Sequence, residues 1–218
     1  MYIPPFNAEH RPEVMHDFMD AHPFAVLVTA GVDGLFATHL PLVLDRERGP
    51  HGTLEGHVAR ANPHHTQTLS SPGALVIFSA PNAYITPTWY PSKVEHGRVV
   101  PTWNYVAIHA YGPLNFRDDE PFLRRHLDVL VARHEAGRGQ PWSLNDAPPG
   151  YIAQQERAIV GFELPISRLE GKWKMSQNRS AADIDGVVCG LASSDAASDR
   201  AVAEIVRARA PKRMGNNA

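Results

Sequence analysis

Residues His57 to Pro63 have the composition and order of a phosphate-binding segment. An apolar strand leads into them. Asn62 followed by Pro63 predicts a helix start, because asparagine caps helices and proline fits a first turn. A helix N-terminus presents free N–H groups and positive potential, which attract anions. With donors from His57 and Arg60, the segment is a candidate monophosphate site built without a glycine loop. The alternative is an ordinary capped helix that carries a surface arginine.

The segment from Lys172 to Arg179 is a second candidate site. It places two lysines, an arginine, two amides and a hydroxyl beside an indole. Such groups can hold a phosphate, the hydroxyls of a polyol chain or the polar edge of a heterocycle. The alternative is a solvated basic turn.

A strand is expected from Val99 to Tyr111, and it could add aromatic walls to a pocket. Side chains alternate along a strand, so Trp103 and Tyr105 share one face while Asn104 lies on the other. The entry end of the strand combines aromatic faces with hydrogen-bonding groups, as a planar ligand with polar edges requires. We expect its centre, residues 106–110, to lie in the barrel interior and in dimer packing.

Several standard motifs are absent from the sequence. It contains no G-x-G-x-x-G or G-x-x-x-x-G-K-[ST] phosphate loop and no G-x-S-x-G nucleophile elbow. The 12 histidines lack H-E-x-x-H and H-x-H spacing, and the single cysteine, Cys189, cannot build a structural zinc site. We therefore predict no protein-bound metal, and no catalytic residue can be assigned.

Composition restricts the class of protein. The chain has 218 residues, 43% of them hydrophobic, and a formal net charge of -2, which argues against a strong binder of nucleic-acid backbones. One cysteine fits a reducing compartment. The first residues lack the basic and apolar regions of a signal peptide, and no run reaches the ~18 apolar residues of a membrane span. We expect a cytoplasmic protein.

The elements that must position these residues follow from hydrophobic periodicity and turn signals. We expect a helix from Pro12 to about Ala21, a second from Asp118 to about Glu135, and one or two more after Ala181. A short helix after Asn62 should end at residues 71–73. Strands are expected at 24–30, 35–44, 53–58, 74–79, 99–111 and 158–169, with a further extended piece at 82–90 and a loop at 91–97. Hairpins without regular strand–helix alternation favour a closed antiparallel barrel of about six strands with peripheral helices.

Four spaced segments resemble a known family. Residues 1–6, 56–64, 100–105 and 171–178 occur in the order and with the sequence typical of the PaiB-like family, described as FMN-binding negative transcriptional regulators. The resemblance runs from Met1 to about Arg179. Many relatives carry tryptophan where His65 stands, and leucine is common where Met175 stands.

The resemblance implies an FMN-binding split barrel, which is a six-stranded antiparallel Greek-key barrel with peripheral helices and is mainly β. We expect a flavin domain at residues 1–180 and, because the composition changes at Ala181, a helical extension at residues 181–218 packed on it. Such barrels are typically homodimers that hold flavin at or near the subunit interface. Carried onto this sequence, the resemblance implies FMN contacts from His57, Ala59, Arg60, Asn62, Lys174, Ser176, Gln177 and Asn178, with Trp103, Asn104 and Tyr105 as walls. Placing the phosphate at His57 and Arg60, and not at Lys174, is our own inference.

Three functions remain open from the sequence. The first is a homodimeric FMN-binding negative regulator; direct DNA binding is poorly supported, because there is neither a helix-turn-helix pattern nor a basic face. The second is a flavin-dependent oxidoreductase that uses NAD(P)H or a small organic substrate, since the cofactor itself carries the chemistry. The third is a haem-handling barrel with His39 or His109 as axial ligand, although a core histidine with satisfied hydrogen bonds explains either residue more simply.

Overall fold

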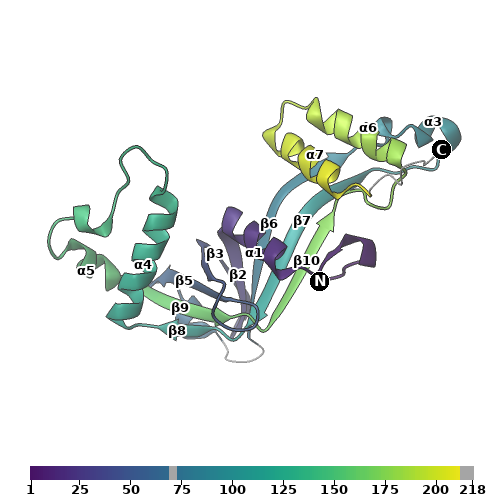
Figure 1. Ribbon diagram of the computed structural model, residues 1–218. Helices are drawn as coiled ribbons and strands as arrows, with labels where there is room; N and C mark the ends of the chain where they lie inside the picture. Colours follow the sequence, from purple (N-terminus) through teal and green to yellow (C-terminus); the bar gives the residue numbers. More distant parts are fainter. Residues whose placement is uncertain (69–72, 212–218) are drawn as a thin grey trace. The chain divides into compact units, whose positions relative to one another are not determined.

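The computed structural model describes residues 1–68 and 73–211 (Figure 1). Its strands are β1 Ala8–Glu9, β2 Phe24–Gly31, β3 Gly34–Pro41, β4 Val43–Asp45, β5 Thr53–Ala59, β6 Ala74–Ile85, β7 Thr102–Gly112, β8 Asn115–Arg117, β9 Ile159–Pro165 and β10 Arg168–Lys174. Its α-helices are α1 Pro12–Ala21, α2 His64–Gln67, α3 Ser92–His96, α4 Glu120–Glu135, α5 Tyr151–Glu156, α6 Ala181–Ala192 and α7 Ala197–Arg209. Short 3-10 turns are η1 Pro5–Asn7, η2 Pro87–Trp89 and η3 Leu144–Asp146.

The strands form two sheets. One has the order β1-β10-β7-β6-β2-β3 and the other the order β4-β5-β9-β8, and the registered neighbours β1/β10, β2/β3, β2/β6, β4/β5, β5/β9 and β8/β9 are antiparallel. The predicted class, antiparallel β with peripheral helices, is confirmed.

Several boundaries differ from those expected. The segment expected as one strand at 35–44 is divided into β3 and β4 at Leu42, whose N–H donates to the Pro23 carbonyl oxygen at 2.9 Å. The segment at 158–169 likewise becomes β9 and the start of β10. The strand expected at 74–79 continues to Ile85 in β6, and the rest of the extended piece expected at 82–90 includes the 3-10 turn η2. Part of the expected loop at 91–97 is helix α3. The expected end of the short helix after Asn62 lies partly outside the described residues, and most of the C-terminal tail does too.

The chain divides into two compact units. Unit 1 comprises residues 1–10, 79–107 and 170–218, and unit 2 comprises residues 11–78 and 108–169. Within the part of the chain that is described, no helix is long and apolar enough to cross a membrane.

The core of unit 2 lies between its sheets and helix α1. Along β2 the buried residues Ala25 and Leu27 alternate with half-buried neighbours, as a strand with one covered face requires. Strand β5 pairs with β9 over its whole length, and Gly56 lies within that ladder. A Cβ atom at Gly56 would lie 2.6 Å from the Phe162 ring, so the close approach there requires glycine.

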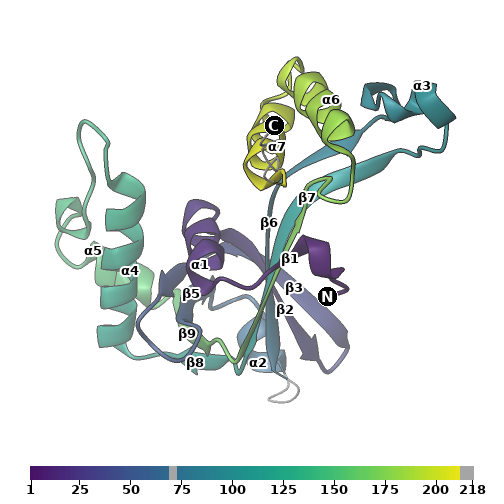
Figure 2. The same cartoon turned by 45° about the vertical axis from the view of Figure 1, so that its right-hand side comes forward.

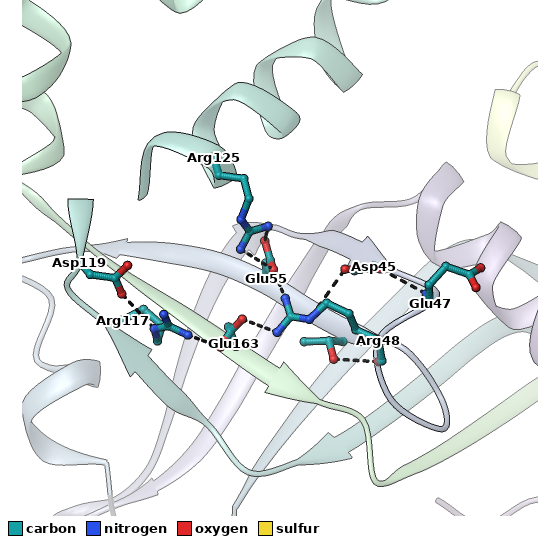
Figure 3. A network of polar contacts seen from close by, with 9 residues as sticks. Asp45, Glu47, Arg48, Glu55, Arg117, Asp119, Arg125 and Glu163 are labelled. Atoms are coloured by element: carbon teal, nitrogen blue, oxygen red, sulfur yellow. Dashed lines mark hydrogen bonds and ion pairs between the residues drawn. The ribbon is translucent and has the colours of Figure 1, made fainter. Parts of the chain in front are cut away.

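Charged side chains join the four-stranded sheet of unit 2 to helix α4. Figure 3 shows Glu55 between Arg48 and Arg125, and Glu163 between Arg48 and Arg117. The side chain of Glu55 is only 2% exposed, so its two arginine partners compensate a carboxylate that would otherwise be buried alone.

Helices α6 and α7 of unit 1 lie side by side (Figures 1 and 2). Helix α6 also packs on η2, and Cβ atoms at Gly186 and Gly190 would come within 2.0 Å of the Trp89 carbonyl oxygen and 2.3 Å of the Trp89 ring. The hydroxyl and N–H of Ser92 both donate to the buried carboxylate of Asp183, on the first turn of α6. Gly186 and Gly190 lie one helical turn apart and have no side chain, so Trp89 can pack directly against helix α6.

Candidate functional site

A cavity of about 260 Å³ lies in unit 1 beside the aromatic strand. Trp103 and Tyr105 of β7 form part of its wall, as the alternation along that strand predicts. Trp103 remains 52% exposed, and its ring meets the half-exposed ring of Tyr84 edge to face at 6.1 Å. Val106 of β7 also lines the cavity, and the remaining walls come from β6 through residues that were not among the predicted contacts, Ser79, Ala80, Pro81 and Asn82.

Lys174 lies on the strand that ends at the predicted turn. Its ammonium donates to the Thr102 hydroxyl and to the Trp103 carbonyl oxygen. Burial lowers the pKa of Lys174, and the positive charges of Lys172 and Arg179 lower it further. The amine is thus held by two neutral acceptors in a locally positive environment.

Two further cations belong to the same segment. Lys172, 7% exposed, donates to the carbonyl oxygen of Tyr2, and its ammonium lies 5.1 Å from the centre of the Tyr105 ring. The Arg179 guanidinium lies 4.7 Å from the centre of the Tyr90 ring. Within residues 1–68 and 73–211, none of the three cations Lys172, Lys174 and Arg179 forms an ion pair with a carboxylate.

The turn after Lys174 is fixed by its own side chains. Ser176 has a left-handed backbone, φ 63°, which is unusual for a residue other than glycine. The buried Ser176 hydroxyl lies 3.0 Å from Asn104 Nδ2, which donates to it, and 3.3 Å from Asn104 Oδ1. The amide of Gln177 accepts from the Met175 N–H at 2.7 Å and donates to the Trp173 carbonyl oxygen. Asn178 is exposed. Thus Asn104, Ser176 and Gln177 use their polar groups to shape the turn.

His57 lies in unit 2 and pairs with a histidine of helix α4. His57 Nδ1 is 3.0 Å from His126 Nε2, and the rings meet at 70°. Burial lowers the pKa of His57. The His126 pKa is lowered to about 3, first by burial and then by the charges of His57 and Arg125. No partner for His126 Nδ1 occurs among the residues described. Both rings are therefore neutral near neutral pH.

Arg60 is exposed, and its donors have partners in the same unit. Its guanidinium forms a two-point ion pair with Asp118, with N–O distances of 2.9 and 2.5 Å. It also donates to the carbonyl oxygens of Arg157 and Ile159. The neighbouring predicted contact, Ala59, is exposed and carries no polar side-chain group.

Asn62 fixes the start of helix α2. Its Oδ1 accepts from the His64 N–H at 2.9 Å, and its Nδ2 donates to the Thr38 hydroxyl at 3.2 Å. The Thr68 hydroxyl donates to the His64 carbonyl oxygen, so the Thr29 hydroxyl donates to Thr68 and accepts from His64 Nε2 at 2.9 Å. In the neutral ring His64 Nδ1 then accepts from the Thr38 hydroxyl, 2.8 Å away. Burial lowers the pKa of His64. The helix start expected at Asn62 is present, but a closed hydrogen-bond ring uses its polar groups.

The structure therefore assembles the predicted residues within each unit. Trp103, Asn104, Tyr105, Lys174, Ser176 and Gln177 lie together in unit 1. His57 and Asn62 join separate networks in unit 2, and Arg60 joins the ion pair with Asp118. Among the residues described, no three histidine, cysteine, aspartate or glutamate side chains are placed to hold a metal ion.

Comparison with known proteins gives a family match over most of the chain. Residues 1–168 match the family described as "Putative FMN-binding domain". The match ends before the turn that follows Lys174, so the family model itself says nothing about that turn.

Two relatives span nearly the whole chain. An uncharacterized protein of Emericella nidulans is 32% identical, with 96% of this chain and 97% of the relative covered. The "Protease synthase and sporulation protein PAI 2" of Bacillus subtilis is 28% identical, and the alignment covers 98% of this chain and 100% of the relative. Among solved structures, the flavocytochrome Anf3 of Azotobacter vinelandii aligns with a TM-score of 0.60 at 16% identity, covering 79% of this chain and 72% of that one. That likeness supports the flavin-binding split-barrel fold.

Proposed function

Because the chain belongs to the FMN-binding domain family, we propose that it acts as a homodimeric FMN-binding protein with a negative regulatory role. The observation that carries this proposal is the combination, within unit 1, of an aromatic-walled cavity and cations that lack a carboxylate partner among the described residues. A planar ring suits Trp103 and Tyr105, and a phosphate suits the cations. When bound, FMN would supply redox chemistry, and these side chains would only bind and orient it.

The residues proposed to touch the flavin are those of the cavity and the turn. Trp103 and Tyr105 offer ring faces, Lys174 offers charge, and the exposed Asn178 offers an amide. Asn104, Ser176 and Gln177 support the turn from within.

For the predicted contacts in unit 2 we propose a structural role. His57, Arg60 and Asn62 are bonded to His126, Asp118 and Thr38 respectively. The absorbance spectrum of the purified protein, with and without added FMN, tests the whole proposal. We expect a flavin band, and a protein that stays colourless and leaves added FMN unperturbed would contradict it.

An apolar sheet face in unit 2 supports the proposed dimer. Leu35 and Ala37 of β3 lie opposite Ala30 and Val28 of β2, and all four are only partly covered. Leu35 is 82% exposed and lines a groove of about 750 Å³. A monomer rarely leaves such a surface in water, and a second copy of the chain would cover it.

The oligomeric state tests this part of the proposal. We expect the mass of a dimer in light scattering after gel filtration. Leu35→Lys should shift the protein to monomer without loss of helix or strand content, because a charge then lies in the interface. Val94→Lys is the matched control, since Val94 is 92% exposed and belongs to unit 1. A wild-type monomer, or equal behaviour of the two variants, would contradict the dimer.

The regulatory role is supported by the relative from Bacillus subtilis, which is named for protease synthesis and sporulation. Because the chain has a formal net charge of -2, direct binding to the DNA backbone is disfavoured, and regulation through another protein or through flavin-dependent metabolism fits better. A gel shift that persists at physiological salt and depends on DNA sequence would instead favour direct binding.

An FMN-dependent oxidoreductase is the alternative function. The exposed ring of Trp103 favours it, because a flavin against this open wall would leave room for a second planar molecule such as a nicotinamide. Anaerobic addition of NADH or NADPH separates the two functions. Bleaching of the flavin band would favour the enzyme, and an unchanged band would favour the regulator.

A further inference from the structure

We propose that a cavity beside helices α4 and α5 of unit 2 binds a small zwitterion of the free amino acid class. The ammonium group of the ligand would lie at Glu120 and its carboxylate at Arg157. This second ligand site is separate from the proposed flavin site, and neither proposal depends on the other.

The cavity has a volume of about 210 Å³. Its walls come from the start of α4, from α5 and from the segments that follow β5 and β8, and all of them belong to unit 2. Helices α4 and α5 lie side by side (Figures 1 and 2). At a share of about 30 Å³ for each water molecule, the space would hold roughly seven waters. That room suits a ligand of the size of a small amino acid.

Two opposite charges in the wall have no partner among residues 1–68 and 73–211. Arg60 and Asp118 also line the cavity, but they neutralise each other in their two-point ion pair. Glu120 and Arg157 are exposed, and the side chain of neither forms a hydrogen bond or an ion pair with a described residue. One cavity thus offers an anion and a cation that are both available.

The fold itself fixes these two charges in place. Glu120 is the first residue of α4, and Arg157 follows the last residue of α5. Helix dipoles favour a carboxylate at the start of a helix and a cation at its end. A ligand with a single charge would match only one of the two side chains, whereas a zwitterion matches both.

A buried carboxylate in the same wall has an unsatisfied acceptor. Glu156 is 4% exposed, and its Oε1 accepts no hydrogen bond from any residue that the structure describes. Arg124 Nε lies 3.0 Å from this oxygen and balances the charge, but it is outside the geometry of a hydrogen bond. A buried acceptor without a donor indicates a missing water or ligand. The ammonium group of a ligand would supply that donor and would face the carboxylates of Glu156 and Glu120.

The rest of the wall is apolar. Leu123 is 3% exposed and Ala153 is half-buried, and neither side chain offers a hydrogen bond. These two residues favour a ligand with a short aliphatic group between its charged ends and the protein. L-valine therefore combines the properties that the cavity selects, and it is the probe for the experiment.

Titration calorimetry with three probes of similar shape tests the inference. L-valine carries both charges, isobutylamine lacks the carboxylate, and isovalerate lacks the ammonium group. We expect wild type to bind L-valine at least about tenfold more tightly than either of the others, because each charged hydrogen bond contributes about that factor. Equal affinity for L-valine and isobutylamine, equal affinity for L-valine and isovalerate, or binding of none of the three would overturn the inference.

Two substitutions separate the roles of the charges. Arg157→Gln should weaken L-valine binding by about tenfold to a hundredfold and leave isobutylamine unchanged. Glu120→Gln should weaken L-valine binding by a similar factor and leave isovalerate unchanged. Both side chains are exposed, so neither substitution should disturb folding.

Arg138→Gln and Glu47→Gln are the matched controls. Both residues are exposed in the same unit and do not line the cavity, so these variants should bind L-valine as wild type does. Equal affinities of the two cavity variants and their controls would contradict the site, while the proposed flavin binding would stand.

Discussion

The buried histidine pair of unit 2 should make the protein sensitive to acid. His57 Nδ1 and His126 Nε2 are 3.0 Å apart, and only one proton can lie between them. Protonating one of the two neutral rings would bury a positive charge beside Arg125, in a site where His126 is fully buried, and protonating both would place two positive rings together. The pair therefore titrates as a unit whose first protonation is displaced to low pH.

The sign and size of the effect follow from the pKa of His126. In the unfolded chain the group has the ordinary value of 6.5, whereas folding lowers it to about 3. Because the folded pKa is the lower one, stability is fully present above about pH 6.5 and is lost as the pH falls. At about pH 5 the unfolded state gains about 2 kcal/mol from this group, at ~1.4 kcal/mol for each pH unit.

Urea unfolding at about pH 7.5 and about pH 5 measures this loss. His126→Gln keeps a hydrogen-bonding group near His57 but does not titrate, so its loss between the two pH values should be smaller than that of wild type by about 2 kcal/mol. His134→Gln is the matched control on the same helix, because His134 is exposed, and it should behave as wild type does. Equal losses for wild type and His126→Gln would refute the assignment of a buried neutral pair.

Two further substitutions test packing and charge. Gly190→Ala should destabilise the protein by about 1–3 kcal/mol in thermal or urea unfolding, because its methyl group would lie 2.3 Å from the Trp89 ring. Gly139→Ala, where nothing lies within 4 Å, should be nearly neutral, and equal effects would contradict the packing. Glu55→Gln should cost about 1–3 kcal/mol in urea unfolding, since two half-exposed arginines lose their buried partner, while the exposed Glu47→Gln should cost little; similar costs would contradict a structural role for the network.

Local signals in the sequence predicted much of the fold. The alternation from Trp103 onward correctly placed Trp103 and Tyr105 on one face and Asn104 on the other, because β periodicity depends only on neighbours in sequence. Asn62 correctly marked a helix start, although the helix begins two residues later, at His64. Such features depend on capping and pleating, which a few adjacent residues determine.

The partners of the candidate residues could not be predicted in this way. Arg60 is paired with Asp118, 58 positions away, and His57 with His126, 69 positions away. Whether an arginine holds a ligand or a carboxylate depends on those distant partners, and one sequence without an alignment contains no signal for them.

The basic segments at residues 57–63 and 172–179 therefore differ in whether a carboxylate already neutralises their cations, and composition does not reveal this. Each combines cations, an amide and a nearby strand end, and each could be interpreted as a phosphate site. A cation whose charge is already matched by a carboxylate must lose that partner to bind an anion, as Arg60 would. A half-buried cation that has, among the residues described, only neutral oxygens as partners, as Lys174 has, gains by binding an anion. The FMN affinities of Lys174→Met and Arg60→Met therefore test whether charge balance within the folded chain identifies the ligand-binding cation. We expect the larger loss of affinity for Lys174→Met, and a larger loss for Arg60→Met would contradict this reasoning.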